Sequence, residues 1–233
     1  MKRPSVLLLA VAGALAGTAA LQAQHINAGA LGTDQGDQLY FENGASFVNT
    51  SGYTKTLTYA TTGTYVGYIQ GSITFTALAR TAESGETPSA NAAALGSFIE
   101  LGIVSVTGPD GGQFAFWDTG ATTPSFSYAT GFSVGSPTAT WDLSDPATAG
   151  GPGEDPFGHL HGRRLTATAP GSYTVGFQLV DTSSNGTGGG PIHTPSDVFY
   201  VNFTAVPEPE EYAAIAAVGL VGFALWRRHA NRA

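Results

Sequence analysis

Apolar and polar side chains alternate at every second position over several short stretches of this chain, which is the spacing of half-buried β-strands. The clearest stretch is 172–181, and 198–205 repeats its pattern next to it in the sequence. The apolar face of the first stretch consists of Tyr173, Val175, Phe177 and Leu179. Further stretches that we expect to form strands are 54–60, 72–79, 98–106, 113–117 and 164–168.

Turn residues separate these stretches, as in the run from Gly108 to Gly112. One short helix is predicted near 90–95. Seven or more short strands with turns between them predict an all-β fold, an antiparallel β-sandwich with an immunoglobulin-like arrangement as one form of it. A Pro-Gly turn before Tyr173 supports this prediction, because sandwiches of that kind use a tyrosine at a strand corner. The long segments 138–157 and 181–195 are predicted to be loops.

The two ends of the chain differ from this pattern. Residues 1–24 combine Lys2 and Arg3 with an apolar run and small residues, which predicts a secretory signal peptide cut near Ala23. Residues 206–233 begin with Val-Pro-Glu-Pro, continue as an apolar stretch over 212–226 and end in an arginine cluster. We therefore predict one β-sandwich domain over 25–205, flanked by signal and sorting helices.

The end of the chain, VPEPEEYAAIAAVGLVGFALWRRHANRA, resembles a PEP-CTERM sorting tail. This resemblance implies export from a Gram-negative cell, processing by signal peptidase and an exosortase, and delivery to the cell surface, the outer membrane or the extracellular matrix. The stretch 212–226 would anchor the chain transiently in the inner membrane, with the arginines on the cytoplasmic side. An ordinary C-terminal membrane anchor is the alternative interpretation.

The charge and cysteine content of the chain argue against several classes of function. The predicted domain has fourteen acidic residues against four basic ones, a net charge of −10, which argues against nucleic-acid binding. The chain has no cysteine, so disulfides, thiolate zinc sites and a cysteine nucleophile are excluded.

Histidine positions suggest a metal site. Of the five histidines, His229 lies in the predicted tail, which leaves His25, His159, His161 and His193. Side chains at i and i+2 of an extended segment lie on one face, so the H-x-H pair can hold one ion. We expect His193 to join them from the glycine-rich loop, with His25 as a further candidate. Imidazole ligands suit zinc, and also copper or another divalent transition metal. Candidates for a fourth ligand are Asp197, Glu154, Asp155 and His25.

The stretches FGHLHGRRLTATAPGSYTVGFQLVD and GGGPIHTPSDVFYVNF are similar to a group of PEP-CTERM proteins controlled by the zinc-uptake repressor. The first also resembles repeated surface-anchored modules found beside bacterial metal transporters. These resemblances imply a role in acquiring or storing zinc under limitation, with a metal transporter as a partner. Extracellular polysaccharide is a second candidate partner.

Two alternatives remain open at this stage: a structural protein of the extracellular matrix that binds no metal, and a copper-dependent oxidative enzyme. The enzyme would need His25 at the mature N-terminus, whereas a cut after Ala23 leaves it second. The G-x-S-x-G match at 131–135 precedes Pro137 and no helical run, so it does not predict a hydrolase. We predict no enzymatic activity. Trp117 and Trp141 are either core residues or a platform for a sugar ring.

Overall fold

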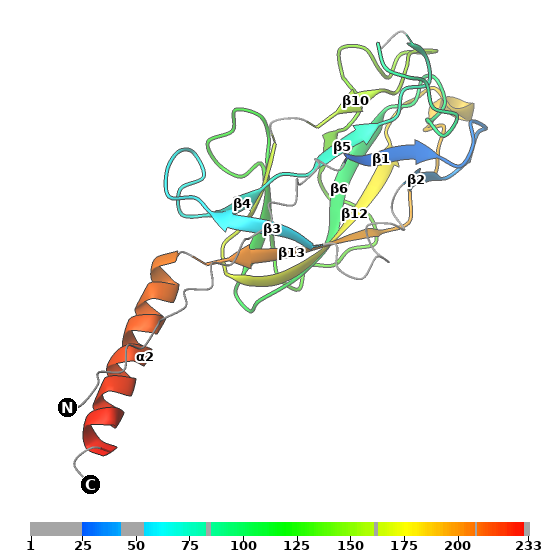
Figure 1. Ribbon diagram of the computed structural model, residues 1–233. Helices are drawn as coiled ribbons and strands as arrows, with labels where there is room; N and C mark the ends of the chain where they lie inside the picture. Colours follow the sequence, from blue (N-terminus) through cyan, green and yellow to red (C-terminus); the bar gives the residue numbers. More distant parts are fainter. Residues whose placement is uncertain (1–24, 43–53, 83–84, 161–162, 208, 231–233) are drawn as a thin grey trace, which may run out of the picture.

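Two β-sheets form the body of the protein in the computed structural model (Figure 1), which describes residues 25–42, 54–82, 85–160, 163–207 and 209–230. The smaller sheet has four strands and the larger one has nine. In spatial order, the strands of the smaller sheet are β10 (Gly158–His159), β5 (Thr74–Ala77), β1 (His25–Ala30) and β2 (Leu39–Phe41).

The larger sheet contains all the remaining strands of the described residues. In spatial order they are β8 (Phe126–Ala129), β7 (Gln113–Trp117), β11 (Arg164–Ala167), β4 (Ile69–Gly71), β3 (Thr54–Tyr59), β13 (Phe199–Val206), β12 (Gly171–Asp181), β6 (Ile99–Thr107) and β9 (Thr140–Asp142). A 3-10 turn, η2 (Thr187–Gly189), lies in the segment between β12 and β13. The all-β prediction is confirmed.

All seven predicted stretches form strands, and the alternation assigns their faces correctly. On β12, the four apolar side chains from Tyr173 to Leu179 are at most 1% exposed. On β13, Phe199, Val201 and Phe203 are buried while Tyr200 is exposed. The two strands pair antiparallel, from Gly171 opposite Ala205 to Phe177 opposite Phe199, and their buried faces contribute to one core.

The prediction of a wholly antiparallel sandwich needs correction, because β1 pairs with β5 and β13 pairs with β3 in parallel. Parallel neighbours require a long connection. Between β1 and β5, the chain leaves the smaller sheet after β2, forms β3 and β4 in the larger sheet, and returns to the smaller sheet as β5. The predicted helix at 90–95 is also wrong, since these residues form turns and irregular backbone.

The larger sheet curls strongly on itself. Phe116 on β7 and Trp141 on β9 belong to opposite ends of this sheet, yet their rings stack at 4.0 Å between centroids and 9° between planes. Trp141 is 5% exposed and Trp117 is 1% exposed. Both tryptophans are therefore core residues, and the alternative of an exposed sugar platform is wrong for them.

The tyrosine corner predicted before β12 is present. The hydroxyl of Tyr173 donates a hydrogen bond to the carbonyl of Ala169, at 2.9 Å. The ring packs beneath the turn between β6 and β7, where a Cβ atom on Gly108 would lie 2.5 Å from its Cδ1. The corner and this turn therefore form one packed unit.

The C-terminal part of the described chain is a helix, α2 (Pro209–Ala230), which projects away from the sheets in Figure 1. Its large apolar side chains from Val218 to Trp226 are 56–74% exposed, and Arg227 and Arg228 occupy its last turn. Among the described residues, no helix reaches the combination of length and apolar character needed to span a membrane. A helix is therefore present where the sorting helix was predicted, and its role as a membrane anchor stays a prediction. The predicted signal helix lies outside the described residues.

Candidate functional site

His25 and His159 lie together on the outer face of the smaller sheet. The register places His159 opposite Thr76 on one side of β5, and β1 runs parallel to β5 on the other side. Because side chains alternate along a strand, Phe75 and Ala77 face the core while Thr76 faces the two histidines. Three strands that are distant in sequence thereby bring two imidazoles to one place.

A single hydroxyl connects the two rings. Nδ1 of His25 lies 3.0 Å from the Oγ1 of Thr76, and Nδ1 of His159 lies 3.1 Å from the same oxygen. The ring centroids are 6.1 Å apart and the planes are at 88°. A hydroxyl has one hydrogen to donate, so at least one of the two Nδ1 atoms must carry a proton and donate to Oγ1. When that imidazole is neutral, its Nε2 has the lone pair that a metal ligand needs.

The surroundings of His159 are partly polar and partly aromatic. Its Nε2 lies 3.8 Å from Oε1 of Glu86, and its side chain is 24% exposed. The ring of Phe157 contacts it edge to face, at 4.6 Å between centroids. Next to His25 on β1, Asn27 donates to the carboxylate of Glu42 at 3.0 Å. The outer face of this sheet is therefore a polar surface with nitrogen and oxygen donors.

His193 is not part of this surface, which corrects the prediction that the glycine-rich loop brings it to the H-x-H pair. It is 2% exposed. Its Nε2 accepts a hydrogen bond from the backbone N–H of Ala94 at 2.9 Å, and its Nδ1 lies 3.0 Å from the carbonyl oxygen of Asp37, to which it donates. Both ring nitrogens are engaged with backbone groups, so His193 has no lone pair left for a metal.

The remaining predicted ligands have other positions. His161 lies outside the described residues. Asp155 is buried and accepts hydrogen bonds from the backbone N–H groups of Arg80, Thr81 and Phe157, so its role is structural. Asp197 accepts from Gln38, and Glu154 from the N–H of Gly151. In the described part of the chain, no three His, Asp or Glu side chains form a group suited to hold a metal ion.

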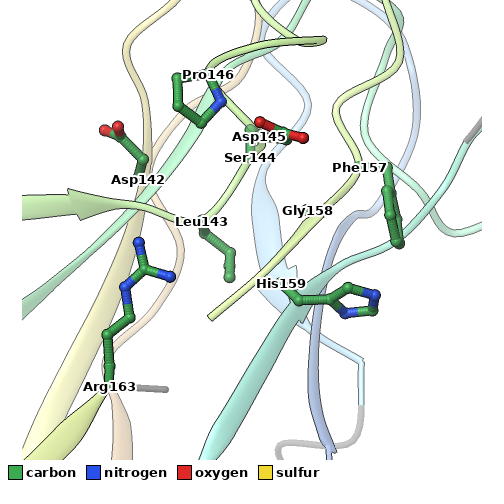
Figure 2. A pocket seen from close by; sticks show the side chains of 9 residues that line it. All are labelled: Asp142, Leu143, Ser144, Asp145, Pro146, Phe157, Gly158, His159 and Arg163. Atoms are coloured by element: carbon green, nitrogen blue, oxygen red, sulfur yellow. The ribbon is translucent and has the colours of Figure 1, made fainter. Parts of the chain in front are cut away.

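A pocket of about 320 Å³ adjoins the backbone of His159. Figure 2 shows Asp142 and Arg163 on one side of it, and Phe157 and the imidazole of His159 on the other. Burial raises the pKa of the Asp142 carboxyl above its ordinary value of 3.8, and the nearby charge of Glu100 raises it further, while Arg163 lowers it. Arg163 itself donates from Nε to Asp118 at 2.9 Å.

Sequence reasoning missed Thr76 and the pocket that Asp142 and Asp145 line together. Thr76 has no distinctive motif, and only its period-two position in a strand between two histidine-bearing segments could have identified it. The carboxylates of Asp142 and Asp145 come from a segment that was predicted to be a loop, where acidic residues are ordinarily solvated. Comparisons with models of known families, with curated proteins and with solved structures found no match for this chain.

Proposed function

We propose that this protein is exported to the cell surface or extracellular matrix and binds a transition metal, zinc foremost, through His25 and His159. The observation that carries the proposal is the shared hydrogen bonding of both Nδ1 atoms to Thr76. Histidine ligands in metal sites usually have their other ring nitrogen held by such a partner, which orients the ring.

The donor chemistry of this surface fits zinc. The two imidazoles supply nitrogen ligands of the kind that zinc accepts, and no thiolate is required. Copper accepts the same imidazoles and remains the second choice. His161 adjoins this surface in sequence and completes the candidate ligand set that the H-x-H spacing predicts.

Export rests on the sequence of both ends and is supported by the exposed apolar side chains of α2, with Arg227 and Arg228 at its end. Signal peptidase and an exosortase would process the chain. At the surface, an acidic domain attracts cations and the imidazoles select among them. The protein then serves metal acquisition or storage under limitation, delivers to a metal transporter, and performs no catalysis.

The test is zinc binding to the full chain, measured by titration calorimetry. Replacing His25 and His159 together by alanine is expected to abolish stoichiometric zinc binding, because both imidazole ligands are lost. His229→Ala is the matched control, since it removes an exposed imidazole from α2, and its binding should equal that of the unchanged protein. His161→Ala measures the contribution of the third histidine separately.

Circular dichroism of each variant confirms that the fold is retained. Unchanged zinc stoichiometry in a folded His25→Ala/His159→Ala protein would contradict the proposal. In that case the alternative of a matrix protein without a metal becomes the better account of this chain.

A further inference from the structure

The pocket shown in Figure 2 shares His159 with the histidine pair but has a chemistry of its own. One wall is the segment from Asp142 to Pro146, which follows β9 in the larger sheet. The opposite wall is residues 157–159, which include β10 of the smaller sheet, and Arg163 closes one end. The pocket therefore lies where the two sheets meet.

Backbone contacts hold the two walls at a defined separation. The N–H of Asp145 donates to the carbonyl of Phe157 at 3.0 Å. The hydroxyl of Ser144 donates to the carbonyl of Pro156 at 2.6 Å and accepts from the N–H of Ile99 at 2.9 Å. A Cβ atom on Gly158 would lie 2.2 Å from the carbonyl oxygen of Leu143, so only glycine permits this close approach. The pocket is thus preorganised, which lowers the entropic cost of binding.

Hydrogen-bonding capacity inside the pocket is only partly used. Asp145 accepts one hydrogen bond at Oδ1, from the N–H of Ala147, which leaves Oδ2 as an acceptor. The carboxylate of Asp142 has no hydrogen bond to another described residue, and it lines the same space. Arg163 uses Nε for Asp118, so its two terminal nitrogens remain as donors. A ligand in this pocket must therefore both donate to carboxylates and accept from a guanidinium.

The balance of charge decides the class of ligand. Burial raises the pKa of Asp142, and the nearby charges of Glu100 and Asp118 raise it further. Asp145, which lines the pocket, adds a fourth carboxylate. One guanidinium, already paired with Asp118, does not compensate four carboxylates, so an anionic ligand is repelled. A ligand without acceptor oxygens, such as a simple amine, would leave the terminal nitrogens of Arg163 without a partner. A neutral ligand with several hydroxyl groups can donate hydrogen bonds to the carboxylates and accept them from the guanidinium, without electrostatic repulsion from either.

Apolar side chains complete the walls. Pro146, Leu143 and Phe157 line the pocket beside the charged groups. Sugar rings combine hydroxyl edges with apolar C–H faces, and they need such a mixed surface. The volume of about 320 Å³ lies at the lower end of the range of about 300–1,000 Å³ usual for small-ligand pockets. From this geometry, we infer that the pocket binds a neutral sugar residue, with Asp142 and Asp145 accepting from its hydroxyls and Arg163 donating to one of its oxygens.

The experiment uses the full-length protein and saturation-transfer NMR with two probes of one shape and different charge: glucose and glucuronate. Maltotriose and cellotriose extend the neutral probe to linked residues. The neutral sugars are expected to show saturation transfer and saturable binding, whereas glucuronate binds at least about 10-fold more weakly because of the carboxylates. Equal binding of glucuronate would overturn the inference, as would the absence of binding by every neutral probe.

Conservative variants test the assigned groups without removing bulk. Asp145→Asn keeps an oxygen for the N–H of Ala147 and loses the charge, and Asp142→Asn does the same on the neighbouring position. Each is expected to weaken the neutral sugar by about 10-fold, as the loss of a charge-assisted hydrogen bond does. Asp110→Asn, in the exposed turn between β6 and β7, is the control and should bind as the unchanged protein does. Unaltered affinity in both pocket variants would place the sugar elsewhere and refute the assignment.

Discussion

The imidazole of His193 holds together two segments that lie far apart in the sequence. It accepts from the N–H of Ala94 and donates to the carbonyl of Asp37, and its own backbone N–H donates to the carboxylate of Asp181 at 3.0 Å. Asp181 also accepts from the N–H groups of Ile192 and Phe98. Buried polar backbone groups need such partners, because an unpaired one costs free energy. His193 is thus a structural residue at the base of the glycine-rich loop.

Replacing His193 by alanine is expected to lower the free energy of unfolding by about 2–4 kcal/mol, because one N–H and one carbonyl lose their buried partner. Urea denaturation followed by circular dichroism measures this change. His229→Ala, on the exposed face of α2, should leave the midpoint unaltered. Zinc stoichiometry in His193→Ala should also be unchanged. Loss of zinc binding in a folded His193→Ala protein would show that our placement of this side chain is wrong.

Thr76 has a comparable importance on the outer face of the smaller sheet. Its side chain is 7% exposed and orients two imidazoles at once. The residue type alone gives no sign of this, because a threonine in a strand is ordinary. Only the pairing of β1 and β10 with the two edges of β5 turns it into the centre of a site.

At the scale of elements, the turn between β6 and β7 and the corner before β12 stabilise each other. Gly108 packs on the ring of Tyr173, and the hydroxyl of Tyr173 lies 2.6 Å from where a Cβ of Gly112 would be. Two glycines in one turn thus leave the space that the tyrosine ring occupies. The corner in turn fixes the start of β12, the strand that pairs with both β13 and β6.

The Gly108→Ala substitution is expected to lower the free energy of unfolding by about 1–3 kcal/mol, since its Cβ would lie 2.5 Å from Cδ1 and 2.7 Å from Cε1 of a fully buried ring. Thermal or urea unfolding measures the loss. Gly135→Ala is the matched control, because no atom lies within 4 Å of its Cβ position and its φ is not in the left-handed region. Equal stability of the two variants would mean that the ring moves aside without cost, contrary to the packing described.

At the scale of the whole molecule, the core is shared by the two sheets. The cluster of buried apolar residues includes Ile26 and Phe75 from the smaller sheet and Phe177 and Phe203 from the larger one. The stack of Phe116 on Trp141 brings the ends of the larger sheet together. In contrast, the large apolar side chains of α2 from Val218 onward are exposed. The stability of the domain therefore resides in the two sheets.

A chain that ends after Pro207 is expected to unfold at the same temperature as the full chain, within about 2 °C, because the described apolar side chains of α2 bury little surface. Differential scanning calorimetry of both proteins checks this. A large drop in the unfolding temperature would mean that α2 packs on the domain in solution. The same truncated protein should retain zinc binding, since the histidine pair lies on β1 and β10.

Long strands could be predicted from the sequence more readily than short ones. Residues 172–181 and 198–205 have enough alternating positions to reveal both the strand and its buried face, and the seven predicted stretches are strands. The strands that were missed are β1, β2, β4, β8, β9 and β10, of two to six residues. Four of them, β2, β4, β9 and β10, have at most three residues, too few to show alternation. The longer β1 is rich in alanine and glycine, which disfavour strands.

By itself, the sequence determined the all-β class, the tyrosine corner and the buried faces of the long strands, because these follow from local alternation and turn chemistry. Only the tertiary structure decided which histidines meet. The choice of His25 over His193 depends on strand pairing between residues at least 49 positions apart, with parallel β1–β5 and antiparallel β10–β5 contacts. Such pairings arise from the packing of the whole core, and no local pattern in the chain encodes them.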